Sequence, residues 1–397
     1  MTLQEDPKDI VVVGAARTPQ GRMLGALAKK SAVDLGAETI KAVLERAGVA
    51  ANEVDYVLMG QVVQAGSGQN PAKQSAVAAG IPMNVPAMTV NKVCLSGLDA
   101  VINASRLIHL GDASIVVAGG QESMTNAPHI AAGVRAGKGY GSLALQDSLE
   151  RDGLSDPNEG TAMGLETDEG NAERGITREE QDEIAARSHQ LAEAATNEGI
   201  FNDEIVSIEV KGRKETVTVS ADEGIRPGTT TEGLAKLRPA FVKDGTITAA
   251  SSSQISDGAA AVVLTTRENA EAKGLEILAT LGEYGQTAGP DTKLHSQPSQ
   301  ATAAALKKAG WEAGDLDFLE INEAFASVVA QSIKDLDYPL EKTNIHGGGI
   351  SLGHPIGASG ARLVVHAAHE LKRRGSGKAA VSLCGGGGQG DALLLWR

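Results

Sequence analysis

Short runs without polar interruption dominate the hydrophobic pattern of this chain. Three of them are rich in valine: IVVVGAAR at 10–17, SIVVAGG at 114–120 and AAVVLTT at 260–266. A strand with one wet face alternates apolar and polar residues, whereas these runs predict strands buried on both faces. We therefore expect an α/β protein whose sheets are covered by helices on both sides.

Helical periodicity lies between these runs. One predicted helix has apolar positions at 33, 37, 40, 44 and 47, with Ser31 placed to cap its start and Gly48 to end it. A second predicted helix begins with a capping box from Thr177 to Glu180 and ends at Gly199. Its inward face is expected at positions 184, 188, 191 and 195.

The chain also repeats itself. The segment AGVAANEVDY (47–56) is similar to AGWEAGDLDF (309–318), and ASIVVAGG (113–120) is similar to AAVSLCGG (379–386) in the same order. Two copies of one α/β unit are the simplest explanation. Because each copy supplies its own strands and helices, the repeat indicates layers in the order α/β/α/β/α.

A different kind of sequence separates the two copies. Residues 1–125 are predicted to form an N-terminal half to which 248–273 return, 126–247 an inserted loop domain, and 274–397 a C-terminal half. The insertion is richer in charge and turn residues, which makes it a natural place for ligand specificity. Its basic residues, which as a group could form a phosphate-binding rim, are Lys211, Arg213, Lys214, Arg226, Lys236 and Arg238.

Composition narrows the class of protein. Hydrophobic residues make up 42% of the chain and charged residues 22%, as in ordinary globular proteins. The net charge of −14 disfavours nucleic acid and acidic membranes as partners. The N-terminus MTLQEDPKDI has no signal pattern, no long apolar run predicts a membrane span, and two cysteines suit a reducing compartment. We expect a cytoplasmic protein.

The two cysteines lie in motifs that favour chemistry over packing. Cys94 lies in NKVCLSG (91–97) and Cys384 in SLCGGGGQG (382–390), each where an apolar run gives way to small residues. Backbone N–H groups can approach a sulfur in such a turn and favour its thiolate. A third motif, SLGHPIGASG, places His354 in a similar setting. The cysteines come from different halves of the repeat, so a site is predicted where the halves meet.

With NEAFA at 322–326, these motifs resemble the signature blocks of the thiolases in order and spacing. The resemblance covers essentially the whole chain and is strongest to the short-chain acetyl-CoA acetyltransferases. It implies a duplicated five-layer α/β/α/β/α fold with an inserted loop domain. It also implies a ping-pong Claisen condensation of two acetyl-CoA to acetoacetyl-CoA, or the reverse thiolysis, with CoA thioesters as substrates and no permanently bound cofactor.

The resemblance assigns a role to each motif. Cys94 would carry the acetyl group, His354 would take the proton of Cys94, and Cys384 would remove the α-proton of the second acetyl-CoA. Asn322, through an ordered water, and His354 would hold one oxyanion. The backbone N–H groups of Cys94 and Gly386 would hold the other.

The resemblance also implies contacts with CoA. The residues placed against its pantetheine and adenine are Leu154, Met163, Arg226, Phe241, Ala249, Ser253 and Phe325. Two features depart from the family pattern: Ala162 stands where many relatives have a histidine, and 292–301 lacks the usual G-x-G-P-type run. Both leave the acyl pocket undefined.

Other interpretations stay open at this stage. A 3-ketoacyl-CoA thiolase of broader chain length in fatty-acid degradation is the nearest alternative, and a non-catalytic acyl-CoA or lipid binder comes from another class. Relatives form dimers or tetramers, and HIAAGVRAGKGYGSL (129–143) lies where tetrameric relatives place an assembly loop. The resemblance thus implies a homodimer or homotetramer.

Two further patterns, a pair of histidines and a glycine run, resemble a metal site and a dinucleotide site. His366 and His369 lie three apart on a probable helix without a third ligand, so we expect surface histidines rather than a metal site. Gly385–Gly390 matches G-x-G-x-x-G, yet only seven residues follow, too few for a dinucleotide site.

Overall fold

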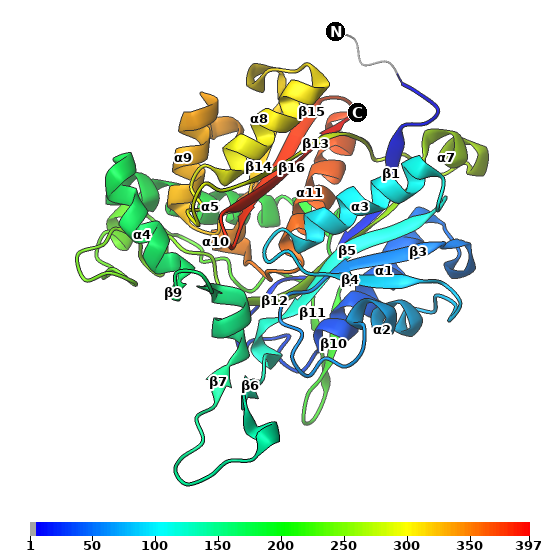
Figure 1. Cartoon of the computed structure of the whole chain (residues 1–397). Helices are drawn as coiled ribbons and strands as arrows, with labels where there is room; N and C mark the ends of the chain where they lie inside the picture. The colour runs from blue at the N-terminus through cyan, green and yellow to red at the C-terminus, as the bar shows by residue number, and fades with distance from the viewer. Residues whose placement is uncertain (1–4) are drawn as a thin grey trace.

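A computed structural model describes residues 5–397, and its centre is one large mixed sheet (Figure 1). The strand order is β14-β15-β16-β13-β1-β12-β5-β3-β4, with β2 paired to β12. The N-terminal strands are β1 (Ile10–Arg17), β2 (Gly21–Arg22), β3 (Tyr56–Gly60), β4 (Ala87–Val90), β5 (Val116–Ser123) and β12 (Ser256–Thr266). The C-terminal strands are β13 (Ala279–Ala288), β14 (Phe318–Ile321), β15 (Lys378–Gly385) and β16 (Gln389–Trp396).

Helices divide this sheet into two layers. A short antiparallel pairing of β1 with β13 joins the N-terminal and C-terminal strands. Helices α3 (Ser96–Leu110) and α11 (Ser359–Arg374) lie between them and contact strands of both sets. Helices α1 (Ala32–Ala47) and α2 (Pro71–Ala78) cover the outer N-terminal side, and α8 (Gln297–Ala309) and α9 (Ala326–Leu336) the outer C-terminal side (Figure 1). The predicted order of layers is confirmed.

The apolar runs are strands buried on both faces. In β1, Ile10 and Val12 belong to the central core around α3 and α11, whereas Val11 and Val13 pack in the outer core with α1 and α2. The C-terminal strands divide their side chains in the same way between the central core and the core beneath α8 and α9. Three apolar layers thus explain why these strands show no alternation of apolar and polar residues.

The repeat predicted from the sequence is present as matching elements. Helices α1 and α8 end at Gly48 and Gly310, both left-handed, with φ of 68° and 66°. Each is followed by a 3-10 turn and a strand, β3 or β14, which pairs in parallel with β5 or β15. Helices α3 and α11 start at equivalent serines and form the shared central layer.

The region between the copies contains smaller elements. Helix α5 starts at the predicted capping box of Thr177 and Glu180 and packs Ile184 into the C-terminal outer core. The strands of this region are β6 (His129–Ile130), β7 (Gln146–Asp147), β8 (Ser155–Asp156), β9 (Thr161–Ala162), β10 (Ile208–Lys211) and β11 (Thr216–Val219). The remaining helices of the chain are α4 (Met163–Arg174), α5 (Arg178–Asn197), α6 (Thr231–Leu234), α7 (Arg267–Lys273) and α10 (Gly349–Leu352). The domain boundaries drawn from the sequence stay a prediction.

The basic residues of this region do not form one rim. Lys211 ends β10, and the β10–β11 hairpin packs on Leu27 and Leu35 of the N-terminal half. Lys236 and Arg238 follow α6, which packs on α5 rather than on the β10–β11 hairpin.

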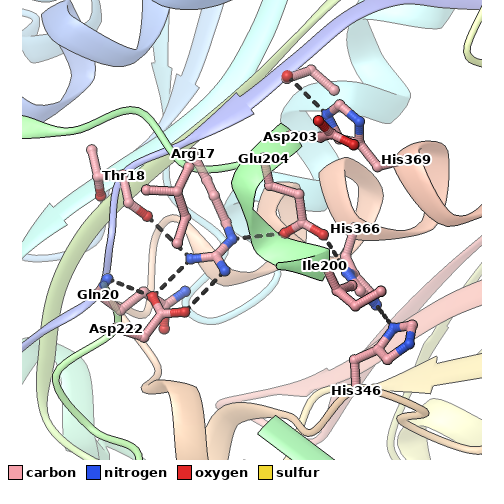
Figure 2. Close-up of polar contacts among 12 residues, drawn as sticks. Arg17, Thr18, Gln20, Ile200, Asp203, Glu204, Asp222, His346, His366 and His369 are labelled. Atoms are coloured by element: carbon pink, nitrogen blue, oxygen red, sulfur yellow. Dashed lines mark hydrogen bonds and ion pairs between the residues drawn. The ribbon is translucent and has the colours of Figure 1, made fainter. Parts of the chain in front are cut away.

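A buried ion cluster fastens the insertion to both halves (Figure 2). Arg17, at the end of β1, donates to Glu204 at 2.9 Å and to both carboxylate oxygens of Asp222 at 2.8 and 2.9 Å. Glu204 also lies 2.5 Å from His366 on α11, whose other ring nitrogen meets His346 at 3.1 Å. All of these charges are therefore paired inside the protein.

The prediction of surface histidines at 366 and 369 is wrong. His366 is 2% exposed and His369 8% exposed, and the second ring meets the carbonyl oxygen of Ala15 at 3.1 Å. The cause is the position of α11 in the central layer, where neighbours cover every face of the helix. No group of three or more His, Cys, Asp or Glu side chains suited to a metal occurs among residues 5–397.

Within the described part of the chain, one helical segment, Val93–Leu110, is long and apolar enough by length and composition to span a membrane. It contains the central helix α3, whose apolar side chains pack in the core. A core helix passes the same test, so this is weak evidence for a membrane span.

Candidate active site

Cys94 lies in a tight turn directly before α3. Val93 adopts a left-handed φ of 52°, which is strained for a β-branched residue. Side chains hold the turn: Ser96 Oγ donates to the Val93 carbonyl at 2.6 Å, and Asn91 Oδ1 accepts the Val93 N–H at 3.1 Å. Lys92 anchors the turn to the C-terminal half through Asp391 at 2.8 Å. The strained turn, held by these hydrogen bonds, places the Cys94 sulfur at the start of α3.

Cys384 ends β15 in the other half, and its motif meets that of Cys94. The glycines after it form the hairpin to β16. A Cβ on Gly385 would lie 2.6 Å from Leu95 Cγ, and one on Gly386 would lie 3.3 Å from Val93 Cγ1 and 3.2 Å from Met163 Sδ. Glycine is required here because the backbone itself packs against the Cys94 turn.

Burial keeps both thiols protonated in the free protein. Cys94 is 5% exposed and Cys384 fully buried, and neither forms a disulfide. Burial raises the pKa of Cys94 to about 12, although the backbone N–H groups of Cys94 and Gly386 favour its thiolate. Burial, and then the charge that Cys94 would carry, raise the pKa of Cys384 as well. Each cysteine therefore needs a partner that takes its proton.

His354 is held as a neutral acceptor. The Ser359 hydroxyl donates to the Pro355 carbonyl at 2.9 Å, so its oxygen accepts Nδ1–H of His354 at 2.5 Å. This leaves Nε2 without a hydrogen, 3.3 Å from the side-chain amide of Asn322. Burial, aided by the charge of Arg362, lowers the pKa of His354 to about 3. The acceptor nitrogen of the ring is thus Nε2, which faces the amide of Asn322.

Asn322 joins this group from the loop after β14. Its backbone N–H donates to the Ser382 carbonyl at 2.9 Å, which ties the loop to the strand that carries Cys384. Its amide nitrogen donates to His354, while its side-chain oxygen is buried without a protein hydrogen-bond partner. The structure therefore brings Asn322 and His354 together, as the shared oxyanion role requires.

Two apolar clusters surround the sulfurs. Leu154 and Val93 pack in the first, whose buried members are Val62, Val63, Cys94, Met124, Leu149 and Ile356. Met163 and Phe325 pack in the second, whose buried members are Leu294, Ala324, Val328 and Cys384. An acyl group attached to either sulfur would be shielded from water.

The other residues assigned to CoA contacts fall into two groups. Phe241 meets Phe325 edge to face with ring centroids 6.0 Å apart, and the Ser253 N–H donates to Ala324, so both lie beside the Cys384 cluster. Ala249 is exposed on the loop before Ser253. Arg226 is exposed too, and its backbone N–H donates to His189 rather than to either cluster.

A cavity of about 1150 Å³ opens beside the two motifs and is lined by Val93, Met163 and Gly386 among others. Ala162, where many relatives have a histidine, is exposed next to Met163 and caps α4 without a side-chain hydrogen bond. The divergent segment 292–301 contributes Leu294 to the Cys384 cluster. This segment therefore packs in the same apolar cluster as Cys384.

Sequence reasoning missed three residues that shape this site. Ser359 lies in the SLGHPIGASG motif but was given no role, although it lies within hydrogen-bond reach of His354. Nothing in the sequence indicates the strained backbone at Val93, because valine is not a residue type associated with left-handed backbone. Glu122 accepts N–H groups of Val62, Val63 and Gly357, and its only signal in the sequence was a charge at the end of a buried strand.

Comparison with known proteins settles the family. The model described as "Thiolase, N-terminal domain" matches residues 10–268, and "Thiolase, C-terminal domain" matches 275–397. The chain belongs to the thiolase family. The predictions of family, fold class and enzyme are thereby confirmed.

Relatives match along the whole chain. A probable acetyl-CoA acetyltransferase of Mycolicibacterium smegmatis is 52% identical over 98% of this chain and its own full length. An acetyl-CoA acetyltransferase of Cupriavidus necator is 49% identical over 98% of this chain and 99% of its own.

Solved structures agree with the fold. The Bacillus anthracis acetyl-CoA acetyltransferase has a TM-score of 0.95 at 40% identity, covering 98% of each chain. The human mitochondrial 3-ketoacyl-CoA thiolase has a TM-score of 0.93 at 39% identity, with the same coverage.

Proposed function

We propose that this thiolase is an acetyl-CoA C-acetyltransferase. It would condense two acetyl-CoA to acetoacetyl-CoA and CoA, or catalyse the reverse thiolysis. The observation that carries the proposal is the meeting of two free-cysteine motifs from different halves, with the loop of the neutral His354 joining the Cys94 cluster through Ile356. The reaction needs one acyl carrier and one carbon-acid base, and the two cysteines can supply them. The names of the relatives support acetyl-CoA as the substrate.

In the first half-reaction, His354 Nε2 takes the proton of Cys94, and the sulfur attacks the thioester carbonyl. The N–H groups of Cys94 and Gly386, which already point at the sulfur, would stabilise the oxyanion. Collapse forms acetyl-Cys94 and releases CoA thiolate. That thiolate takes the proton of Cys384, so that CoA leaves as a thiol and Cys384 becomes the base.

In the second half-reaction, the Cys384 thiolate removes the α-proton of the next acetyl-CoA. The enolate attacks the acetyl group on Cys94, forming the carbon–carbon bond. Cys94 leaves as thiolate and recovers its proton from His354. The amide of Asn322, adjacent to His354, is suited to stabilise the enolate oxygen. All protons balance over the cycle.

Coenzyme A thioesters would be the only ligands required, with no permanently bound cofactor. Leu154, Met163, Phe241 and Phe325 would line the path of the pantetheine chain, because they flank the two sulfur clusters. Ser253 lies beside the Cys384 cluster and would contact the same chain, whereas Arg226 and Ala249 are exposed and would contact CoA farther from the sulfurs.

A broader 3-ketoacyl-CoA thiolase is the second candidate, favoured by the similarity to the human mitochondrial enzyme. Rates of thiolysis decide between the two. The proposal predicts a higher kcat/KM with acetoacetyl-CoA than with a long-chain 3-ketoacyl-CoA. The opposite ranking would favour the second candidate, and no turnover of either substrate would favour a non-catalytic acyl-CoA binder.

We also propose a cytoplasmic enzyme of fatty acid metabolism that assembles as a homodimer or homotetramer. The segment between β6 and β7 supports assembly, because it projects from the body of the molecule (Figure 1) and exposes Val134, Tyr140, Leu143 and Leu145. Sedimentation of the purified protein tests the oligomeric state. A monomer at micromolar concentration would contradict it.

A further inference from the structure

A buried carboxylate joins the two halves beneath the active site. Glu122, near the end of β5, is fully buried. Its Oε2 accepts the backbone N–H groups of Val62 and Gly357, both at 2.9 Å, and its Oε1 accepts that of Val63 at 3.2 Å. Val62 and Val63 follow β3 in the N-terminal half, whereas Gly357 belongs to the His354 loop of the C-terminal half.

The backbone that Glu122 holds forms the walls around Cys94. Val62, Val63 and Ile356 pack in the apolar cluster that contains the Cys94 sulfur. Gly357 lies between His354 and Ser359, the residue that orients the imidazole. A shift of this loop would therefore move the base and the walls of the nucleophile pocket together.

The His354 loop packs tightly against its neighbours at Gly357, and Glu122 makes the polar contact there. A Cβ on Gly357 would lie 2.7 Å from Glu122 Oε2 and 2.8 Å from Gln61 Cα. From the other side, Cβ atoms on Gly60 and Gly120 would lie 2.6 and 2.0 Å from the Gly357 carbonyl oxygen. The loop thus rests directly on β3 and β5, and Glu122 provides the polar link between them.

We propose that Glu122 is a positioning residue for acyl transfer, whose carboxylate sets the placement of His354 relative to Cys94 by binding both loops. This rests on the function proposed above for those two residues. Burial raises the pKa of Glu122 to about 7, although the three N–H groups favour its carboxylate. Burial raises the pKa of Cys94, and the charged form of Glu122 raises it further, which disfavours a free thiolate before His354 accepts its proton.

Two substitutions test the link. Glu122→Ala removes both oxygens that accept the three backbone N–H groups and should lower kcat roughly 100-fold, the order expected for a misplacement of about 1 Å. Glu122→Gln keeps one oxygen for Val62 and Gly357 but turns an NH₂ toward Val63, so kcat should fall only roughly tenfold. In both variants the KM for acetyl-CoA should stay within about threefold of wild type.

Glu204→Gln is the matched control, because Glu204 is also a fully buried carboxylate but belongs to the ion cluster. It should lower the melting temperature without changing kcat per folded molecule. A kcat unchanged in Glu122→Gln, or a change confined to KM, would overturn the proposal. If Glu122→Ala does not fold, Glu122→Gln alone decides.

A second readout separates this proposal from the proposed function. Rapid quenching after addition of acetyl-CoA gives the rate at which Cys94 is acetylated. Slow acetylation of Cys94 in Glu122→Gln supports the positioning role, and wild-type acetylation rates refute it. Failure of the wild-type protein to form the adduct would instead refute the proposed function.

Discussion

Two buried polar regions of this thiolase differ in whether their titratable groups are charged: the ion cluster around Glu204, and the candidate active site around Cys94 and His354. In the ion cluster, Arg17 and His366 face Glu204 at 2.9 and 2.5 Å. Burial favours the neutral carboxyl, yet His366 and Arg17 hold the pKa of Glu204 well below its usual value. In the catalytic site, burial raises the pKa of Cys94 to about 12 and lowers that of His354 to about 3.

The difference lies in the partners. Each charge in the ion cluster has an opposite charge at hydrogen-bond distance, so the charged forms are favoured and the cluster holds the fold together. The cysteines and His354 have neutral partners, so they stay neutral until substrate arrives. Proton transfer from Cys94 to His354 is therefore unfavourable in the free protein, because both pKa shifts oppose it, and it must be coupled to attack of the sulfur on the bound thioester.

The largest effect should follow loss of the nucleophile. Cys94→Ser should lower the rate of acetoacetyl-CoA thiolysis by about 10³-fold or more, because a hydroxyl is far harder to ionise in this buried site. The free energy of unfolding should change by less than about 1 kcal/mol, since the exchange is nearly isosteric. A variant with full thiolysis activity would contradict the role of Cys94.

In the ion cluster we expect a loss of stability without a loss of activity. Arg17→Met leaves Glu204 and Asp222 buried without their cation and should destabilise the fold by about 3–5 kcal/mol. Urea unfolding measures the change. The kcat of the folded fraction should match wild type, and a selective loss of kcat would show that the two regions are not independent.

A smaller effect on rate is expected at Ser359. Ser359→Ala removes the acceptor of His354 Nδ1–H and lets the ring adopt the wrong tautomer. We expect kcat to fall roughly tenfold, with KM nearly unchanged. Steady-state kinetics test this, and Ser359→Thr, which retains a hydroxyl, should recover part of the loss. Equal kcat values for wild type and Ser359→Ala would remove Ser359 from the mechanism.

The smallest effect is a pH dependence of stability. Burial opposes the charge of His366, but Glu204 raises its pKa above the usual value. Its stabilising charge is therefore complete below about pH 6.5 and is lost as pH rises through the folded-state pKa. The stability difference between wild type and His366→Gln should shrink between pH 6 and 9 in urea titrations. A difference independent of pH would contradict a charged His366.

The sequence predicted the fold where signals are local. The valine-rich runs became β1, β5 and β12, and Ser31 with Gly48 bounded α1 as expected. Hydrophobic periodicity, caps and glycine turns depend on neighbouring residues, which is why these elements could be identified. The motifs also placed both cysteines at turns where their two halves meet.

Long-range contacts could not be predicted. His366 was assigned to the surface because its partner Glu204 lies in a distant insertion, and polar residues on a helix usually face water. Glu122 gains its role from N–H groups at 62, 63 and 357, which no local pattern connects to it. Every residue except proline has the same backbone N–H and C=O groups, so the sequence does not show which of them a distant side chain will bind.

The most direct test of the two cysteine roles is peptide mapping of the acetylated protein. After incubation of Cys384→Ala with acetyl-CoA and acid quenching, the acetyl group should accumulate on Cys94, because the base needed for the second half-reaction is missing. Wild type should show the same adduct at lower occupancy during turnover. An adduct on Cys384 in the wild-type protein, or none on Cys94 in either protein, would contradict the assignment.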